Sequence, residues 1–161
     1  MSDQLNGTVP VPPGPLVLNL QYTKDLSFEV PGAPDIFLNL QENPRLDVAL
    51  DVNARKLQDE HPVYEVVFQV RADAKLTDGR TAFIVELAYC GIFTVNVAED
   101  VLEAVLLVEC PRLLFPFARN ILADVTRDGG FPPVLLTPID FVALWQSRRG
   151  QSSGIAPVAN A

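Results

Sequence analysis

Four stretches in the first two-thirds of the chain alternate apolar and polar residues, as strands with one buried face do. In the first, Leu16 to Val30, even positions are apolar except for Lys24, and the mostly polar odd positions include Asp25 and Glu29. The other three stretches cover residues 46–52, 63–76 and 82–97. Between the last two, Asp78-Gly79 indicates a tight hairpin turn, and Gly91 predicts a bulge or bend. We therefore predict four strands, with Asp25 and Glu29 on the solvent-facing side of the first.

After residue 97, apolar residues recur every three to four positions, which indicates helices. Asn96 and Glu99 have the spacing of a capping box, so a helix is predicted from there through Val108. Pro111 can begin a second helix, which Gly129-Gly130 ends. The predicted apolar face of that helix consists of Leu113, Phe117, Ile121 and Val125, with Leu114, Ala118 and Leu122 beside them. A short final helix is predicted over residues 138–149.

Strands followed by helices predict an α+β fold with a four-stranded antiparallel sheet. Residues 1–15 hold four prolines and little to bury, so we predict a flexible N-terminal arm. Residues 16–149 form a single predicted domain, and residues 150–161 a disordered C-terminal tail. Prolines bound the segment 31–44 and disfavour a regular helix or strand there. Its apolar residues are expected to pack over another apolar surface.

Composition adds two constraints. The 161-residue chain has a formal net charge of −8 and 48% apolar residues, which in an acidic protein predicts self-association or an exposed apolar groove. The negative charge argues against nucleic acid or an anionic membrane as a partner and favours basic partners. We also predict no direct membrane insertion. The sequence shows no basic, apolar leader and no stretch of membrane-spanning length, and its two scattered cysteines fit reduced thiols. We therefore predict a cytoplasmic protein.

The sequence offers few residues for catalysis. The single His61 excludes a multi-histidine metal site, and Cys90 and Cys110 alone do not complete a zinc tetrahedron. Asp25 and Glu29 share a strand face but lie about 13 Å apart, beyond the roughly 5 to 9.5 Å of paired glycosidase carboxylates. We predict no enzyme activity, no cofactor and no metal, and interpret the two acids as part of a negative surface.

Five segments, in the same order, resemble the SecB family of bacterial protein-export chaperones. They are YTKDLSFEVPGAP (22–34), VYEVVFQVRADAKL (63–76), TAFIVEL (81–87), GIF (91–93) and CPRLLFPFARNILADVTRDGGFPPVLLTPIDFVALW (110–145). The resemblance covers most of the chain from about Leu20 to Trp145. It implies an α+β subunit that assembles as a homotetramer, a dimer of dimers. It also implies a cytoplasmic chaperone that binds unfolded precursor proteins, keeps them translocation-competent and delivers them to the SecA motor ATPase.

The resemblance places the SecA-docking surface on Asp25 and Glu29 in the first strand and on Ile84 and Glu86 in the fourth. All four residues lie on the polar side of the predicted strands. The alternation and the resemblance therefore agree on an exposed, negative face. In the family, the docking segment of SecA is basic and contains zinc, and complementary charge accelerates encounter.

The resemblance also implies a groove for unfolded clients, between the segment after the first strand and the C-terminal helical region. Its walls would include Ile36, Phe37, Leu38, Leu135, Leu136, Phe141, Leu144 and Trp145. Each of these apolar residues can instead belong to the packed core, and the sequence leaves both interpretations open.

Three functions remain as hypotheses. The first is the export chaperone, which the intact docking residues favour. The second is a SecB-like chaperone dedicated to an antitoxin or another single partner. The third is an acidic oligomeric adaptor that binds one folded protein, which the breadth of clients would distinguish from a chaperone.

Overall fold

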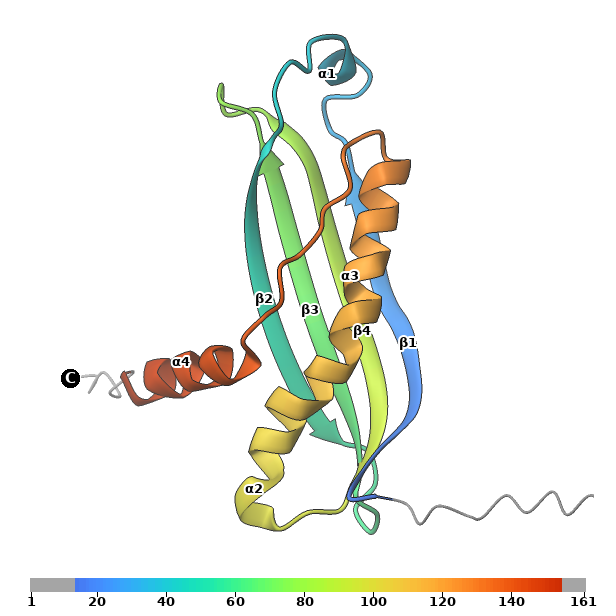
Figure 1. Cartoon of the computed structure of the whole chain (residues 1–161), viewed down its shortest axis with the longest axis vertical. Coiled ribbons are helices and arrows are strands. Elements are labelled where there is room, and N and C mark those ends of the chain that lie inside the picture. Colours follow the sequence, from blue (N-terminus) through green and yellow to red (C-terminus); the bar gives the residue numbers. More distant parts are fainter. Residues whose placement is uncertain (1–13, 155–161) are drawn as a thin grey trace, which may run out of the picture.

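The computed structural model describes residues 14–154, with side chains to residue 151. Its four strands are β1 (Leu16–Glu29), β2 (Arg45–Lys56), β3 (Val63–Lys75) and β4 (Thr81–Val95). They form one antiparallel sheet in the order β1-β4-β3-β2, so β1 and β2 are its edges (Figure 1). The predicted α+β fold with a four-stranded antiparallel sheet is confirmed. We call the side of the sheet that bears Phe68 and Leu87 the helix face, and the side that bears Asp25 and Glu86 the outer face.

One helical segment runs from residue 99 to residue 128 in three parts: α2 (Glu99–Ala104), the π-helical turn η1 (Val105–Glu109) and α3 (Cys110–Asp128). The predicted capping box is wrong, because Ala98 is the N-cap and no side chain hydrogen-bonds there. The predicted start of a separate helix at Pro111 is also wrong. The chain continues through η1, where the N–H of Cys110 bonds to the carbonyl of Val105. Pro111 cannot donate a helical hydrogen bond, and the widened turn directly before it accommodates that loss.

Helix α3 fully buries one of the two apolar rows of its predicted face. Leu114, Ala118 and Leu122 are fully buried, and α3 packs on β3 and β4. Leu113 and Phe117, by contrast, are 44% and 45% exposed. Both rows are apolar, so their periodicity does not decide which one meets the sheet. As a result, the second row lies at the flank of α3, where Leu113 and Phe117 stay partly exposed while Ile121 and Val125 pack against the core.

The alternation of side chains between the two faces of the sheet shifts twice along β1. Its pairing with β4 skips Asn19 and Lys24, and each skipped residue is a β-bulge. Between the bulges, Leu20 and Tyr22 lie on the outer face, although strict alternation predicts them on the buried one. The second bulge restores the predicted faces from Asp25 onward. The two bulges therefore decide which side chains of β1 lie on the outer face, where a partner can reach them.

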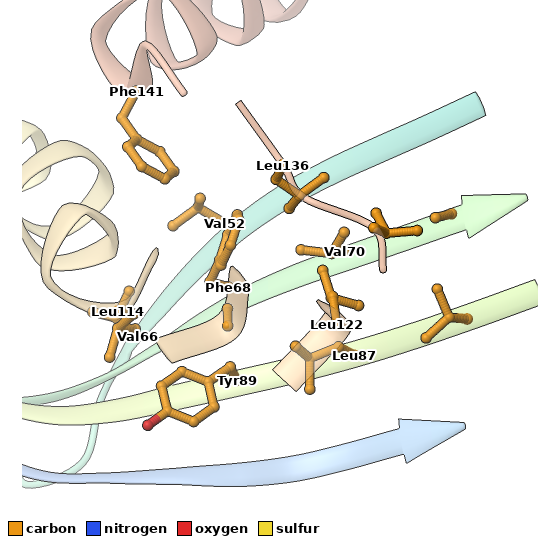
Figure 2. Close-up of a cluster of buried hydrophobic side chains, with 14 of the residues drawn as sticks. Val52, Val66, Phe68, Val70, Leu87, Tyr89, Leu114, Leu122, Leu136 and Phe141 are labelled. Atoms are coloured by element: carbon orange, nitrogen blue, oxygen red, sulfur yellow. The ribbon is translucent and has the colours of Figure 1, made fainter. Parts of the chain in front are cut away.

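The core lies between the helix face and the segments that cover it, as Figure 2 shows. Alternate residues of β3 and β4 form its floor, and side chains of α3 and of the chain beyond it pack from above. Burying one large apolar side chain contributes about 1.5 to 3 kcal/mol, so this layer dominates the stability of the fold. Its labelled members are Val52, Val66, Phe68, Val70, Leu87, Tyr89, Leu114, Leu122, Leu136 and Phe141.

Three segments complete the described chain. The short helix α1 (Asp35–Leu38) interrupts the predicted irregular segment between β1 and β2. After α3, residues 129–140 run along the helix face without regular structure to α4 (Phe141–Gly154) (Figure 1). Because α4 continues to residue 154, the prediction of disorder is wrong for residues 150–154. Residues 1–13 of the predicted arm and 155–161 of the predicted tail lie outside the described residues.

Gly91 lies in regular register with both neighbouring strands, so the predicted bulge or bend there is wrong. A Cβ atom at this position would come within 2.5 Å of the Phe93 ring and 3.0 Å of Leu114. Real Cβ atoms do not make contacts as short as 2.5 Å. The glycine therefore serves the close approach of α3 to β4.

We expect Gly91→Ala to lower the free energy of unfolding by about 1 to 3 kcal/mol, the usual cost of overpacking a core. Urea denaturation followed by circular dichroism measures the change. Gly150→Ala in α4 is the control, because a Cβ atom there meets nothing within 4 Å. An unchanged denaturation midpoint for Gly91→Ala would contradict the close packing of α3 on the sheet.

Candidate functional site

The four residues that the sequence assigns to SecA docking lie together on the outer face. Across β1 and β4, Glu29 pairs with Ile84 and Ser27 pairs with Glu86, while Asp25 lies two positions from Ser27 on the same face. Asp25 and Glu29 are exposed, and Ile84 and Glu86 are half-buried. The register thus places one apolar side chain among three carboxylates. Their role in docking SecA stays a prediction.

Arg71 of β3 neutralises part of this face. Its Nε lies 2.9 Å from Oδ2 of Asp73, and its guanidinium also pairs with Glu86. The hydrogen bond and charge of Asp73, followed by the charge of Glu86, raise the pKa of Arg71. Within residues 14–154, Asp25 and Glu29 have no ion-pair partner. These two carboxylates therefore give the face its uncompensated negative charge.

A depression of about 310 Å³ lies on the outer face beside these residues. Three carboxylates and one cation line it together with small side chains, and the alanines of β2 and β4 leave its floor open. This charge suits a basic side chain of a partner and disfavours an anion. The outward-facing lining residues are Asp25, Ala49, Asp51, Gln69, Arg71, Glu86 and Ala88.

The remaining part of the outer face holds a buried carboxylate that sequence analysis missed. Glu65 of β3 is 4% exposed and accepts hydrogen bonds from the Tyr22 hydroxyl, from Lys24 Nζ (3.2 Å) and from Arg55 Nε (3.0 Å). The bond from Tyr22, followed by those from Arg55 and Lys24, holds the pKa of Glu65 at about 2. Burial and the same carboxylate raise the pKa of Tyr22. The network links both edge strands to the middle of the sheet.

On the helix face, two cavities lie along the edge strand β2, and we call the strip of strand from one to the other the groove. Leu46 and Val48 of β2 are 40% and 41% exposed, because α3 covers β3 and β4 and leaves the edge strand open. A cavity of about 150 Å³ lies at the start of β2, lined by Asn43, Pro44, Leu46, Phe83, Phe131, Pro132, Pro133, Val134 and Leu135. A second cavity, of about 210 Å³, lies beside α4, lined by Val52, Glu103, Leu107, Leu144, Trp145, Arg148 and Arg149.

Three of the predicted groove residues are core residues of the described chain. Ile36 and Phe141 are each 2% exposed and Leu136 is 8% exposed, so none of them forms part of the groove surface. The ring of Phe141 packs edge-on against Phe68, with centroids 5.6 Å apart. These three side chains pack beneath the groove, and assigning them to its surface is wrong for the single chain.

The other five predicted groove residues lie at the surface. Phe37, Leu38 and Leu135 are 40%, 80% and 60% exposed. Leu144 and Trp145 are half-buried and line the cavity beside α4, where Trp145 Nε1 lies 3.5 Å from Oε1 of Glu103. Both ends of the groove therefore contain predicted residues, and binding of clients by them stays a prediction.

Comparison with known proteins identifies the family. A family model described as preprotein translocase subunit SecB matches residues 12–152. The chain belongs to the SecB family. The SecB protein-export protein of Granulibacter bethesdensis is 60% identical over 143 residues, covering 85% of this chain and 84% of that protein. The one from Acidiphilium cryptum is 56% identical over 160 residues, covering 91% of this chain and 96% of that protein.

A solved structure shares the fold of this SecB-family chain. It is a SecB-like chaperone of Mycobacterium tuberculosis in complex with an antitoxin peptide, with a TM-score of 0.64 and 13% sequence identity. The match covers 78% of this chain and 91% of that one. At this identity the likeness supports the fold alone.

Leu46 and Val48 are groove residues that sequence reasoning missed in this SecB-family chain. Their alternation correctly indicates a strand, and nothing local distinguishes it from a strand buried on one face. Only the strand order, with β2 at the edge, shows that these side chains lie beyond the reach of α3. An edge position depends on pairing between distant segments, which the hydrophobic pattern does not record.

In the described part of this SecB-family chain, the cysteines are poorly placed for catalysis and no metal-binding cluster is found. Cys90 and Cys110 are buried free thiols, and burial raises the pKa of both, that of Cys110 to about 12. The reactive thiolate is therefore disfavoured. Across residues 14–154, no cluster of three or more histidines, cysteines and acids is arranged to hold a metal ion. In the same residues, no helix is long and apolar enough to cross a membrane.

Proposed function

We propose that this SecB-family chain is a protein-export chaperone. In the cytoplasm it binds unfolded precursor proteins, keeps them translocation-competent and delivers them to the SecA ATPase. The observation that carries the proposal is the apolar groove along β2, where Leu46, Val48 and Leu135 are between 40% and 60% exposed. Exposed apolar residues gathered on one face of a protein with a well-buried core favour a binding site there. The relatives that cover most of the chain are protein-export proteins, which supports the same function.

The energetics of such a groove explain why it would select unfolded chains. Burying one large apolar side chain contributes about 1.5 to 3 kcal/mol. Ordering each client residue costs about 1 to 2 kcal/mol in backbone entropy. A short segment therefore binds weakly, whereas a long unfolded chain occupies several grooves and gains through effective concentration. Folded proteins offer no such chain, and release needs no ATP hydrolysis.

Assembly as a homotetramer, a dimer of dimers, would bring several grooves together. The apolar row of α3 that contains Leu113 and Phe117 supports self-association because these two side chains are 44% and 45% exposed. Ile121 continues this row as a half-buried residue. Association through such a row removes apolar surface from water and leaves the groove along β2 available.

Delivery to SecA would use the outer face. Asp25 and Glu29 give this face uncompensated charge, and Ile84 supplies an apolar contact among the carboxylates. Because the face lies on the opposite side of the sheet from the groove, SecA and a client can bind to one subunit at the same time. This separation suits a protein that must present its cargo to a second protein.

The alternative of a chaperone dedicated to an antitoxin has less support. The relatives that are 45% to 60% identical to this chain are protein-export proteins. The likeness to the antitoxin-binding chaperone of Mycobacterium tuberculosis extends to the fold at 13% identity. An adaptor for one folded partner would not need an apolar groove along a sheet edge.

A light-scattering experiment tests the proposal. A chemically denatured, aggregation-prone precursor is diluted into buffer with this protein in the absence of ATP. We expect wild type to suppress aggregation near one tetramer per precursor chain. The double variant Leu46→Gln, Leu135→Gln should need about tenfold more protein for half-suppression, because two partly exposed apolar contacts are lost.

Leu57→Gln is the matched control. Leu57 is 37% exposed in the turn after β2 and lines neither of the two groove cavities. The control should suppress aggregation as wild type does. If wild type gave no suppression, or if it bound the same precursor equally well after folding, the chaperone proposal would be wrong.

A further inference from the structure

We infer that Thr126 positions the client groove of this chain, by holding the segment that forms one of its walls. The segment is residues 132–139, which we call the groove loop. The inference rests on the proposed client binding and adds to it a buried residue that touches no client. It concerns how the groove keeps its shape.

The groove loop is held by very little backbone bonding. It contains three prolines, Pro132, Pro133 and Pro138, which lack an N–H group. Within residues 14–154 it makes a single hydrogen bond to protein, from the N–H of Val134 to Oγ1 of Thr126, with a length of 2.9 Å. An irregular segment usually has several such bonds. Two things therefore hold this loop: the core packing of Val134 and Leu136, and one hydrogen bond to a hydroxyl that fixes the direction of its backbone.

The burial and hydrogen bonding of Thr126 fix its hydroxyl in position for this contact. It lies near the end of α3, is fully buried, and its Oγ1 lies 2.7 Å from the carbonyl oxygen of Leu122. The hydroxyl donates its one proton to that carbonyl and uses a lone pair to accept the N–H of Val134. Both partners are needed to satisfy a buried hydroxyl, so its orientation is fixed.

The hydrogen bond from Val134 to Thr126 sets which side chains of the loop face solvent and which face the core. Val134 and Leu136 are 5% and 8% exposed, whereas Leu135 between them is 60% exposed. Directing the Val134 N–H toward α3 turns its side chain into the core and that of Leu135 outward. Leu135 and Leu46 of β2 then line the same 150 Å³ cavity from the loop and the strand.

The opposite wall of the cavity is held separately. The carboxylate of Glu42 accepts hydrogen bonds from the hydroxyl and, at 2.9 Å, from the N–H of Thr77 at the turn between β3 and β4. This contact fixes the segment before β2, which contains Asn43 and Pro44. Losing the Thr126 bond therefore loosens one wall, which the core packing of Val134 and Leu136 still holds in part, while the other wall stays in place. We expect this to change the width of the groove.

Amide hydrogen exchange of the wild-type full chain, followed by NMR, tests the geometry directly. The amide of Val134 should exchange more slowly than those of Leu135, Leu136 and Thr137, because it alone in the groove loop is bonded. Equal exchange at the four amides would overturn the inference without any substitution.

Binding of a permanently unfolded chain, reduced and carboxymethylated α-lactalbumin, tests the consequence for function by fluorescence anisotropy. Thr126→Val keeps the shape of the side chain but removes the hydroxyl. We expect it to weaken binding by about threefold to tenfold, the range for losing one hydrogen bond, and to make the Val134 amide exchange rapidly. Thr126→Ser retains the hydroxyl and should bind within about twofold of wild type. Thr23→Val, the same change at an exposed position of β1, should have no effect.

The outcomes separate this inference from the proposed function. If wild type fails to bind the unfolded chain, the chaperone proposal fails, and the exchange experiment still decides the role of Thr126. If wild type binds, and a folded Thr126→Val binds equally well, the inference is overturned while the chaperone proposal stands. Equal losses in Thr126→Val and Thr126→Ser would also overturn it, because the hydroxyl would then not be the cause.

Discussion

Glu65→Gln is expected to lower the free energy of unfolding by about 3 kcal/mol at pH 7, the value that linkage gives for a carboxyl whose pKa falls from 4.5 to about 2 on folding. Glutamine keeps the size of the side chain but loses the charge that attracts Lys24 and Arg55. It also offers one oxygen where the carboxylate offers two. The side chains of the two cations are 47% and 67% exposed, so water solvates them in the variant and limits the loss.

The pH dependence of this loss has a definite sign. The folded pKa of Glu65 lies below the unfolded one, so the carboxylate stabilises the fold fully above about pH 5. Between about pH 4.5 and pH 2 the unfolded state takes up the proton first, and the stabilisation disappears. The difference between wild type and Glu65→Gln should therefore be constant at neutral pH and shrink as the solution is acidified. Urea denaturation at several pH values measures it.

Glu60→Gln provides the control for this experiment. Glu60 is exposed in the turn between β2 and β3 and makes no hydrogen bond or ion pair within the described part of the chain. Its substitution removes the same charge and should leave stability nearly unchanged. A difference between wild type and Glu65→Gln that stayed constant down to pH 2 would mean that packing, and not the ionised carboxylate, causes the loss.

The Glu65 network also shows where sequence reasoning stops. The alternation of apolar residues located all four strands and correctly placed Asp25 and Glu29 on the outer face. It wrongly placed Tyr22 in the core. The bulges at Asn19 and Lys24 reverse the faces of the residues between them, so Tyr22 lies on the outer face. Neither position carries a glycine or another local signal for a bulge. The error arises from strand pairing, which is set by contacts with β4.

The client groove shows a second limit of the same kind. The apolar character of Leu46, Leu135 and Phe141 is plain in the sequence, but burial separates them into two surface residues and one core residue. Burial depends on whether another element covers the position, and α3 covers only part of the helix face. Thr126 escaped notice because a threonine within an apolar helix has no distinctive pattern. Its partner, Val134, is brought near only by the turn after α3.

Neutralising Asp25, Glu29 and Glu86 together, to Asn, Gln and Gln, is expected to weaken binding to SecA by about 30-fold at low salt. An exposed charge pair contributes up to about 1 kcal/mol, so three carboxylates facing a basic segment account for a change of this size. Most of it should appear as slower association, because charge steers the encounter. Surface plasmon resonance at two salt concentrations separates the two rates.

A matched triple variant distinguishes the effect of the outer face from the effect of net charge alone. Asp59→Asn, Glu60→Gln and Asp100→Asn together also remove three negative charges, from exposed positions in the β2–β3 turn and α2. Either triple variant changes the formal net charge from −8 to −5. If binding depended on total charge, both would weaken it equally, and the outer face would lose its special role. If the outer face docks SecA, only the first variant should lose affinity. It should also keep its binding of unfolded precursors, since the groove lies on the other side of the sheet.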